Sequence, residues 1–221
     1  MAAEAETGGF LQRPWGGDDS LRQRFEAVAP YLAGWSVLDV GCASRFGRPD
    51  WVHGLVASCA REAVGIDLDA EKVSAIAATG HDVHVADARH FDLGRTFEVV
   101  FAGELIEHLD DVRGFLRSVR RHLRGDGRLV LTTPSTFYLA NFVYRLRGSA
   151  RVHPEHTCWF CASTIRQVLA TNGFTVTHLD YVGHQPPTPA RRLAAAAAER
   201  LLPPALSRDT MLVVAAPAPS P

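Results

Sequence analysis

Two short apolar runs in this chain each stop at an acidic residue. The first ends in Asp39-Val40-Gly41 and the second ends in Asp67. If both runs are parallel β-strands, these residues lie at the carboxyl edge of one sheet, where α/β proteins bind ligands. A glycine there lets the backbone approach a ligand closely, and an acid on the second strand can accept hydrogen bonds from both hydroxyls of a ribose. The sequence therefore predicts a site for a nucleoside-containing cofactor.

The elements that must position these residues alternate along the chain. Helix-spaced apolar stretches separate short apolar runs, which predicts a doubly wound parallel sheet with helices on both faces. The last two strands follow each other without a regular crossover, so we expect a closing antiparallel hairpin. The strands are expected at 36–42, 63–68, 83–86, 97–102, 128–133, 174–181 and 211–216, and the main helices at 21–32, 50–60, 70–79, 111–123 and 163–171.

The length and composition set further bounds. With 221 residues, of which 47% are hydrophobic and 21% charged, the chain suits one soluble domain. We expect a flexible leader at 1–18, a single domain at 19–216 with a Pro- and Ala-rich helical insertion at 184–208, and a tail at 217–221. The net charge of −1 gives no basic footprint for nucleic acid or for an anionic membrane. No apolar run approaches the ~20 residues of a membrane span, and the acidic N-terminus is unlike a signal peptide, so a cytoplasmic location is expected.

Four cysteines are too few and too scattered for a secreted disulfide framework. Cys158 and Cys161 form a Cys-x-x-Cys pair, which can be redox-active or half of a zinc site. A redox pair usually opens a helix after a strand, and a structural zinc site needs further regularly spaced ligands. Packing roles are therefore favoured for both residues.

Five sequence blocks resemble those of the class I S-adenosylmethionine-dependent methyltransferases. They are 38–42 (Leu-Asp-Val-Gly-Cys), 64–67 (Val-Gly-Ile-Asp), 86–88 (Ala-Asp-Ala), 100–104 (Val-Phe-Ala-Gly-Glu) and 125–131 (Gly-Asp-Gly-Arg-Leu-Val-Leu), and the resemblance covers nearly the whole chain. It implies a Rossmann-like doubly wound, seven-stranded, mostly parallel sheet with a C-terminal antiparallel hairpin. It also implies S-adenosylmethionine as the cofactor.

The same resemblance implies roles at the matching positions. Gly41 and its neighbours would face the amino acid moiety, Asp67 the ribose hydroxyls, and Asp87 with Ala88 the adenine edge. Glu104 would stand near the sulfonium. The full expected cofactor set is Asp39, Gly41, Cys42, Ala43, Gly47, Asp67, Leu68, Asp87, Ala88, Ala102 and Glu104.

The glycine loop after the first strand departs from the family pattern. The family's loop runs Asp-x-Gly-x-Gly-x-Gly, whereas 39–47 reads Asp-Val-Gly-Cys-Ala-Ser-Arg-Phe-Gly, so only the first glycine is in place. A nicotinamide-binding Rossmann protein also ends its second strand in an acid, but it has Gly-x-Gly-x-x-Gly in this loop. A reductase-type Tyr-x-x-x-Lys is excluded as well, because the only lysine is Lys72. The methyl donor is the favoured ligand.

Methyl transfer to a hydroxyl requires a base that removes the proton or a metal ion that polarises the oxygen. Glu104, Glu107 and His108 follow the fourth strand, and a helical turn would place them on one face. Together with His156 they resemble the metal-binding set of the small-RNA 2′-O-methyltransferases and of the ubiquinone-biosynthesis O-methyltransferases. Two carboxylates and two imidazoles suit Mn²⁺, Fe²⁺ or Zn²⁺ better than Mg²⁺. The alternatives are metal-free acid–base catalysis by His108, His153 or His156, with Glu104 beside the cofactor, and purely structural roles.

The segment 135–162 corresponds to the family's insertion over the acceptor, which predicts a lid on that side. Its candidate substrate residues are Tyr138, Arg147, Arg151, His153 and Trp159. The arginines could clamp an anionic acceptor or form a solvated face. The favoured function is O-methylation of a small molecule such as a secondary metabolite, a sugar or an anionic acceptor. The alternatives are a non-catalytic S-adenosylmethionine-binding regulator or subunit and an N- or RNA-directed methyltransferase. The sequence gives no indication of the oligomeric state.

Overall fold

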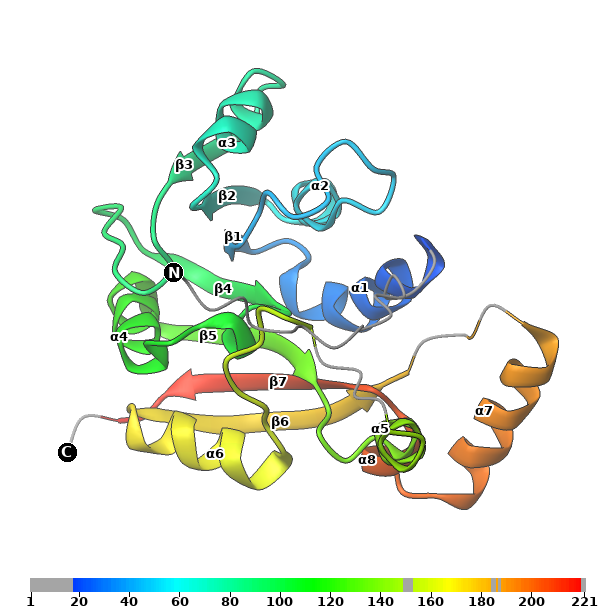
Figure 1. Ribbon diagram of the computed structural model, residues 1–221. Coiled ribbons are helices and arrows are strands. Elements are labelled where there is room, and N and C mark those ends of the chain that lie inside the picture. Colours follow the sequence, from blue (N-terminus) through cyan, green and yellow to red (C-terminus); the bar gives the residue numbers. More distant parts are fainter. Residues whose placement is uncertain (1–17, 149–152, 184–185, 187, 220–221) are drawn as a thin grey trace, which may run out of the picture.

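The computed structural model describes residues 18–148, 153–183, 186 and 188–219, and a seven-stranded sheet runs through them in the order β3-β2-β1-β4-β5-β7-β6 (Figure 1). Neighbouring strands from β3 to β5 pair in parallel, and β7 is antiparallel to both β5 and β6. The predicted sheet and its closing hairpin are confirmed. The strands are β1 (Ser36–Val40), β2 (Glu62–Asp67), β3 (Asp82–Val85), β4 (Phe97–Gly103), β5 (Leu123–Pro134), β6 (Phe174–Val182) and β7 (Thr210–Pro217).

The central strands are buried on both faces, as their continuous apolar sequences require. All of β1 is buried, and in register its Asp39 lies beside Gly65 of β2 and Phe101 of β4. A Cβ atom at position 65 would lie only 2.7 Å from Cys42 Sγ and 2.9 Å from His53 Cε1, so any side chain there would collide with these residues. Gly65 therefore lets the β1 loop and the following helix pack directly on the sheet.

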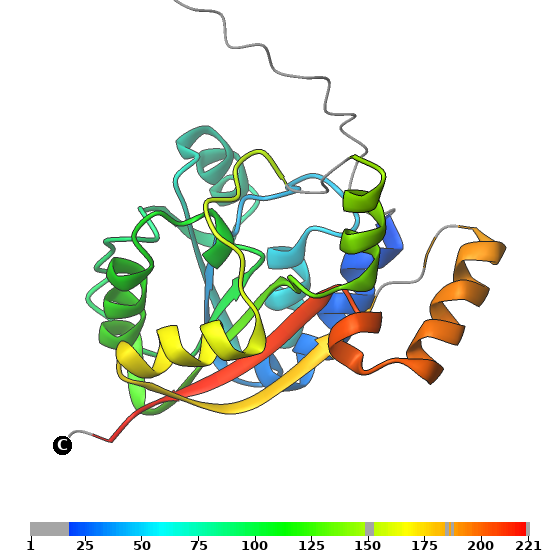
Figure 2. The same ribbon diagram turned by 60° about the horizontal axis from the view of Figure 1, so that its bottom comes forward.

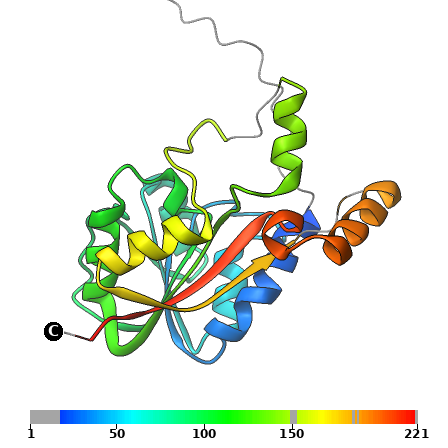
Figure 3. The ribbon, with the colours of Figure 1, turned by 90° about the horizontal axis from the view of Figure 1, so that it is seen from below.

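Two helical layers cover the sheet (Figure 3). Helices α1 (Asp18–Leu32), α2 (Val52–Cys59) and α3 (Ala70–Ala77) pack on the face that carries Val37 and Val83. Helices α4 (Val112–His122) and α6 (Ala162–Thr171) pack on the face that carries Leu38 and Val100. Because side chains alternate along a strand, neighbouring residues of β1 belong to different cores.

Two helix starts differ from the sequence prediction. The helix expected at 50–60 begins later, with Trp51 as the N-cap of α2, and Asp50 is buried in an ion pair with Arg45 at 2.5 Å. Ser163 was expected to open α6, but Cys161 is the N-cap and forms a capping box with Thr164. In both cases a polar side chain that could cap a helix lies one residue or two away from the true end.

Two parts of the chain stand apart from the layers. In the expected lid, α5 (Leu139–Leu146) projects away from the sheet, and residues 153–161 return toward it (Figures 2 and 3). In the expected helical insertion, α7 (Pro189–Leu201) and α8 (Pro204–Ser207) follow each other beside the end of β6. The structure describes all residues of α5 and α7, and none of them is buried. Most of the expected leader, residues 1–17, lies outside the described residues, as do 220 and 221.

Within the described part of the chain, no helix is both long enough and apolar enough to cross a membrane.

Candidate functional site

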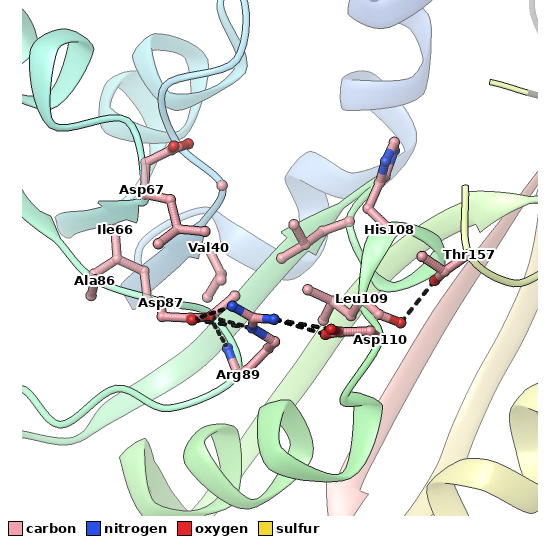
Figure 4. A pocket seen from close by; sticks show the side chains of 14 residues that line it. Val40, Ile66, Asp67, Ala86, Asp87, Arg89, His108, Leu109, Asp110 and Thr157 are labelled. Atoms are coloured by element: carbon pink, nitrogen blue, oxygen red, sulfur yellow. Dashed lines mark hydrogen bonds and ion pairs between the residues drawn. The ribbon is translucent and has the colours of Figure 1, made fainter. Parts of the chain in front are cut away.

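A cavity of about 360 Å³ opens at the carboxyl edge of the sheet, where β1, β2 and β4 end (Figure 4). The cavity lies where the order of the parallel strands reverses, the place at which open α/β sheets bind ligands. It is lined by Val40, Gly41, Ile66, Asp67, Leu68, Ala86, Asp87, Ala88, Arg89, Leu105, His108, Leu109, Asp110 and Thr157. Five of the expected cofactor residues are in this set, namely Gly41, Asp67, Leu68, Asp87 and Ala88.

The β1 loop is tied to the end of β2. The backbone N–H groups of Gly41 and Cys42 both donate to the Ile66 carbonyl, at 2.8 and 3.1 Å. Gly41 has a φ of 91°, a conformation that glycine adopts without steric cost. Asp67 accepts the Ala43 N–H at 2.9 Å and the Asp69 N–H at 3.0 Å, one on each carboxylate oxygen. These bonds fix the orientation of the Asp67 carboxylate at the cavity wall.

The structure shows how the loop manages without its third glycine. Arg45 stands at that position of the pattern and has a φ of 63°, in the left-handed region. Its guanidinium lies 2.5 Å from the buried Asp50 carboxylate, so an ion pair supports the strained backbone. Gly47, the residue expected to close the loop, also has a positive φ of 83° but does not line the cavity.

An ion-pair chain borders the cavity on the adenine side of the predicted site. Arg89 binds both oxygens of Asp87, at 2.7 and 3.0 Å, and reaches Asp110 at 2.9 Å (Figure 4). These hydrogen bonds lower the pKa of Asp87, so it is ionised at neutral pH. Sequence analysis missed Arg89 and Asp110, although Arg89 follows the predicted Asp87 by only two residues.

Four expected cofactor residues support the site without lining the cavity. Asp39 is buried, and its carboxylate is hydrogen-bonded to His53 Nδ1 at 2.9 Å. Cys42 is buried, its carbonyl accepts the Trp51 indole N–H at 2.8 Å, and burial raises the pKa of its thiol. Ala102 lies in the core. Ala43 belongs with them, since it meets the site only through its bond to Asp67.

Glu104 lies next to the cavity in a cluster of buried charges. Arg24 of α1 contacts Glu104 at 3.3 Å and Asp209, just before β7, at 3.1 Å. Burial raises the pKa of Glu104, and Arg24 opposes this shift. Arg24 and Asp209 were not predicted, because they come from opposite ends of the chain.

Glu107 lies in the same region and is 1% exposed. One of its oxygens accepts the Thr133 hydroxyl at 2.9 Å, and Oε1 has no hydrogen-bond partner among the described residues. Burial, followed by repulsion from Glu104, raises the pKa of Glu107 to about 8. Glu107 is therefore mainly protonated at neutral pH.

Of the predicted four-residue metal set, the structure brings His108 and His156 together, with His153 as a third neighbour. Glu104 has a φ of 51°, and the residues after it form a short 3-10 turn, Ile106–His108, labelled η1. Glu104 stays close enough to Glu107 to raise the pKa of that carboxyl. In the described residues, the side chains whose ligand atoms lie within 4.8 Å of one another are His108, His153 and His156.

The three histidines meet where the lid segment returns to the sheet. The Thr157 backbone N–H donates to the Glu107 carbonyl at 2.8 Å, and its hydroxyl donates to the Leu109 carbonyl at 2.9 Å, which docks residues 153–157 onto η1. Burial lowers the pKa of His108, and burial with the neighbouring histidines lowers the pKa of His156 to about 4. Both rings are therefore neutral at pH 7.

The candidate substrate residues are dispersed. Trp159 donates its indole N–H to His156 Nδ1 at 3.3 Å, so it belongs to the histidine cluster. Tyr138 is the N-cap of α5, and Arg147 is exposed at the other end of that helix. Arg151 lies outside the described residues. Of the Cys-x-x-Cys pair, Cys161 caps α6, and Cys158 lies 3.8 Å from the carbonyls of Ile106 and Glu107.

Known proteins are similar to this chain in sequence and in fold. A probable S-adenosylmethionine-dependent methyltransferase of Mycobacterium tuberculosis, Rv3030, is 27% identical over 165 residues, which cover 73% of this chain and 57% of the relative. The chain thus spans little more than half the length of that relative. A ubiquinone biosynthesis O-methyltransferase of a Bradyrhizobium species is 26% identical over 183 residues, covering 76% of this chain and 70% of the relative.

A solved structure agrees in fold. Magnesium protoporphyrin IX methyltransferase from Synechocystis, determined with bound SAH, has a TM-score of 0.63 at 14% identity, covering 95% of this chain and 90% of the other. The family model described as a methyltransferase domain matches residues 11–179, which is more than half of the sequence. This match, with the seven-stranded sheet and its cavity, shows that the chain belongs to the class I S-adenosylmethionine-dependent methyltransferases.

Proposed function

We propose that this protein transfers a methyl group from S-adenosylmethionine to an oxygen atom of a small-molecule acceptor. The observation that carries the proposal is the cavity at the carboxyl edge, which combines Gly41, Asp67, Asp87 and Ala88 on one side with His108 on the other. The first four match the donor-binding positions of the family. His108 lies on the side toward the lid segment, where an acceptor could enter.

The residues present fit the cofactor. The carboxylate of Asp67 is fixed at the cavity wall and retains lone pairs for ribose hydroxyls, while Gly41 offers backbone without a side chain. When bound, S-adenosylmethionine supplies an electrophilic methyl group on a sulfonium. An acceptor oxygen forms the new C–O bond, the electron pair of the broken C–S bond stays on sulfur, and the acceptor proton leaves to a base or to water.

Positioning of donor and acceptor supplies most of the catalysis of such an in-line displacement. The lid segment contributes by closing the side of the cavity at Thr157 and by bringing His153 and His156 up to His108. Three imidazoles on the acceptor side of the cavity could take up the acceptor's proton or polarise its oxygen. An oxygen acceptor is supported by the similarity to a ubiquinone biosynthesis O-methyltransferase. The net charge of −1 disfavours RNA as the acceptor.

Calorimetry with S-adenosylmethionine and S-adenosylhomocysteine tests the donor site. We expect both to bind the wild type and to bind Asp67→Ala at least ~10-fold more weakly, because hydrogen bonds to a charged group contribute about 1.5–3 kcal/mol. Asp126→Ala is the matched control, since Asp126 is exposed in β5 at the far edge of the sheet. Absence of binding to the wild type would refute the cofactor assignment.

Labelled S-adenosylmethionine tests the reaction. Incubation with a panel of phenols, sugars, carboxylic acids and amines should place the label on an oxygen, with His108→Ala reducing turnover by about 10²-fold or more. Binding of the cofactor without transfer to any acceptor would instead favour a non-catalytic binding protein. Transfer to the amines alone would favour an N-methyltransferase.

A further inference from the structure

We propose that His108, His153 and His156 bind one transition-metal dication of the Zn²⁺ type beside the methyl-donor cavity. The three side chains come from two segments, η1 and the lid, that are 45 or more residues apart in sequence. One ligand nitrogen from each lies within 4.8 Å of the others. Metal–nitrogen bonds of about 2.0–2.1 Å require nitrogens about 3.3 Å apart in a tetrahedral site, so small side-chain rotations suffice.

The donor chemistry selects the ion. Three imidazoles suit Zn²⁺, Fe²⁺, Co²⁺ or Ni²⁺, whereas Mg²⁺ and Ca²⁺ prefer oxygen ligands. The Glu155 carboxylate lies 3.8 Å from His153 Nδ1 and 4.0 Å from His108 Nδ1 and offsets part of the positive charge. Three protein ligands leave at least one coordination position open, which is the pattern of catalytic rather than structural zinc sites.

The cluster is accessible to an ion. The rings of His108 and His156 meet edge to face, with interplanar angles of 89° between them and 70° between His108 and His153. The side chains of His108 and His153 are 27% and 42% exposed, so a hydrated ion can reach the cluster.

The site deepens the proposed function, on which its catalytic role rests. His108 lines the cavity, so an ion held there would adjoin the methyl donor and could take an acceptor hydroxyl in its open position. A bound dication lowers the pKa of such a hydroxyl. The proton would leave to water or to Glu155, the oxygen would attack the methyl carbon, and the C–S electron pair would stay on sulfur.

Loading the site must break one hydrogen bond, which provides a direct readout. His156 Nδ1 accepts the Trp159 indole N–H at 3.3 Å. A neutral imidazole has one lone-pair nitrogen and one N–H. An ion on Nδ1 displaces the indole, and an ion on Nε2 moves the proton to Nδ1, which then repels the indole. Either way the fluorescence of Trp159 changes on metal binding.

The experiment uses tag-free, full-length protein stripped of metal by dialysis against a chelator. Zn²⁺ is titrated by calorimetry, Co²⁺ by visible absorption, and tryptophan fluorescence is recorded throughout. We expect one ion per chain with a Kd of micromolar or below, no displacement by millimolar Mg²⁺, and a fluorescence change that Trp159→Phe abolishes. His153→Ala and His156→Ala should weaken binding at least tenfold, while His90→Ala, at an exposed histidine elsewhere, should not.

Unchanged Zn²⁺ affinity in both cluster variants, or no binding by the wild type, would overturn the metal site. Thermal unfolding of each variant verifies that it is folded, which is expected because His153 and His156 lie outside the sheet. S-Adenosylmethionine binding is measured separately on the stripped protein. Failure of that binding refutes the proposed function, and failure of the metal titration refutes only the metal site.

Discussion

Glu104 and Glu107, the two acids that follow β4, differ in burial and in electrostatic surroundings. The Glu104 side chain is 25% exposed and has a guanidinium at 3.3 Å, whereas Glu107 is buried and, among the described residues, forms a side-chain hydrogen bond to the Thr133 hydroxyl through one oxygen. An isolated buried carboxylate becomes neutral because desolvation penalises its charged form. Glu107 therefore acts as a protonated, hydrogen-bonding group that links η1 to β5.

The pKa of Glu107 predicts a specific pH dependence of stability. The pKa is about 8 in the folded protein and 4.5 as the ordinary value, so the folded state binds the proton more tightly. This contribution is fully present below pH 4.5 and is lost as the pH rises through 8, at about 1.4 kcal/mol per pKa unit. Glu107→Gln keeps a neutral side chain at every pH. Its free energy of unfolding should therefore fall by a few kcal/mol less between pH 5 and 8 than that of the wild type.

Urea unfolding at pH 5, 6, 7 and 8 with chelator present measures this difference. Glu71→Gln, at an exposed acid in the first turn of α3, is the control and should keep the wild-type slope. Parallel pH profiles for Glu107→Gln and the wild type would contradict a protonated Glu107.

At the residue scale, sequence analysis predicted the acids that end strands and missed their partners. Gly41, Asp67 and Asp87 were found because each directly follows an apolar strand. Arg24 could not be found in this way, because it contacts a residue 80 positions away and another 185 positions away. No local pattern encodes such a pair, and only the packing of α1 on the sheet creates it.

Arg24 links helix α1 to the carboxyl edge of the sheet. Arg24 is 11% exposed and bridges Glu104 after β4 to Asp209 before β7. We predict that Arg24→Met, which keeps the apolar contacts, lowers the free energy of unfolding at pH 7 by about 2–3 kcal/mol. This loss is at or below the one expected when one partner of a fully buried ion pair is removed, because Glu104 is partly exposed.

The loss should shrink at pH 5, because burial raises the pKa of Glu104, and without the guanidinium that carboxyl becomes neutral more readily. Arg22→Met on the exposed side of the same helix is the control and should change stability by less than about 0.5 kcal/mol. An equal loss in both variants at both pH values would point to helix propensity rather than to the charge cluster.

At the element scale, strands were easier to predict than the ends of helices and loops. Continuous apolar runs identify buried strands, and the closing hairpin followed from two strands without a crossover. A helical turn was expected after β4, and the structure has a 3-10 turn at Ile106–His108, preceded by Glu104 in the left-handed region. Backbone strain of this kind depends on tertiary contacts, here the bond from the Glu104 N–H to the Thr132 carbonyl at 2.9 Å.

The whole molecule divides into a packed sheet that builds the cofactor cavity and attached segments that reach beyond it. The sheet and the helices of its two layers contain nearly all of the buried apolar side chains. Helix α7 lies beyond them, and its Leu193 and Leu201 are 75% and 78% exposed (Figure 3). Buried apolar area is the main source of stability, so α7 should contribute little to folding of the sheet.

Replacement of α7 by a Gly/Ser segment of equal length tests this division. We expect Tm to change by no more than about 2–4 °C, which corresponds to about 1 kcal/mol in a chain of this size. S-Adenosylmethionine at 100 times its Kd should stabilise both proteins by about 2.7 kcal/mol and raise Tm by about 5–10 °C, because the cavity lies at the carboxyl edge and none of its lining residues belongs to α7. Differential scanning calorimetry with and without the cofactor measures both quantities. A wild-type shift that disappears in the variant would mean that α7 helps to form the donor site, and a large loss of Tm without cofactor would mean that α7 is part of the folding unit.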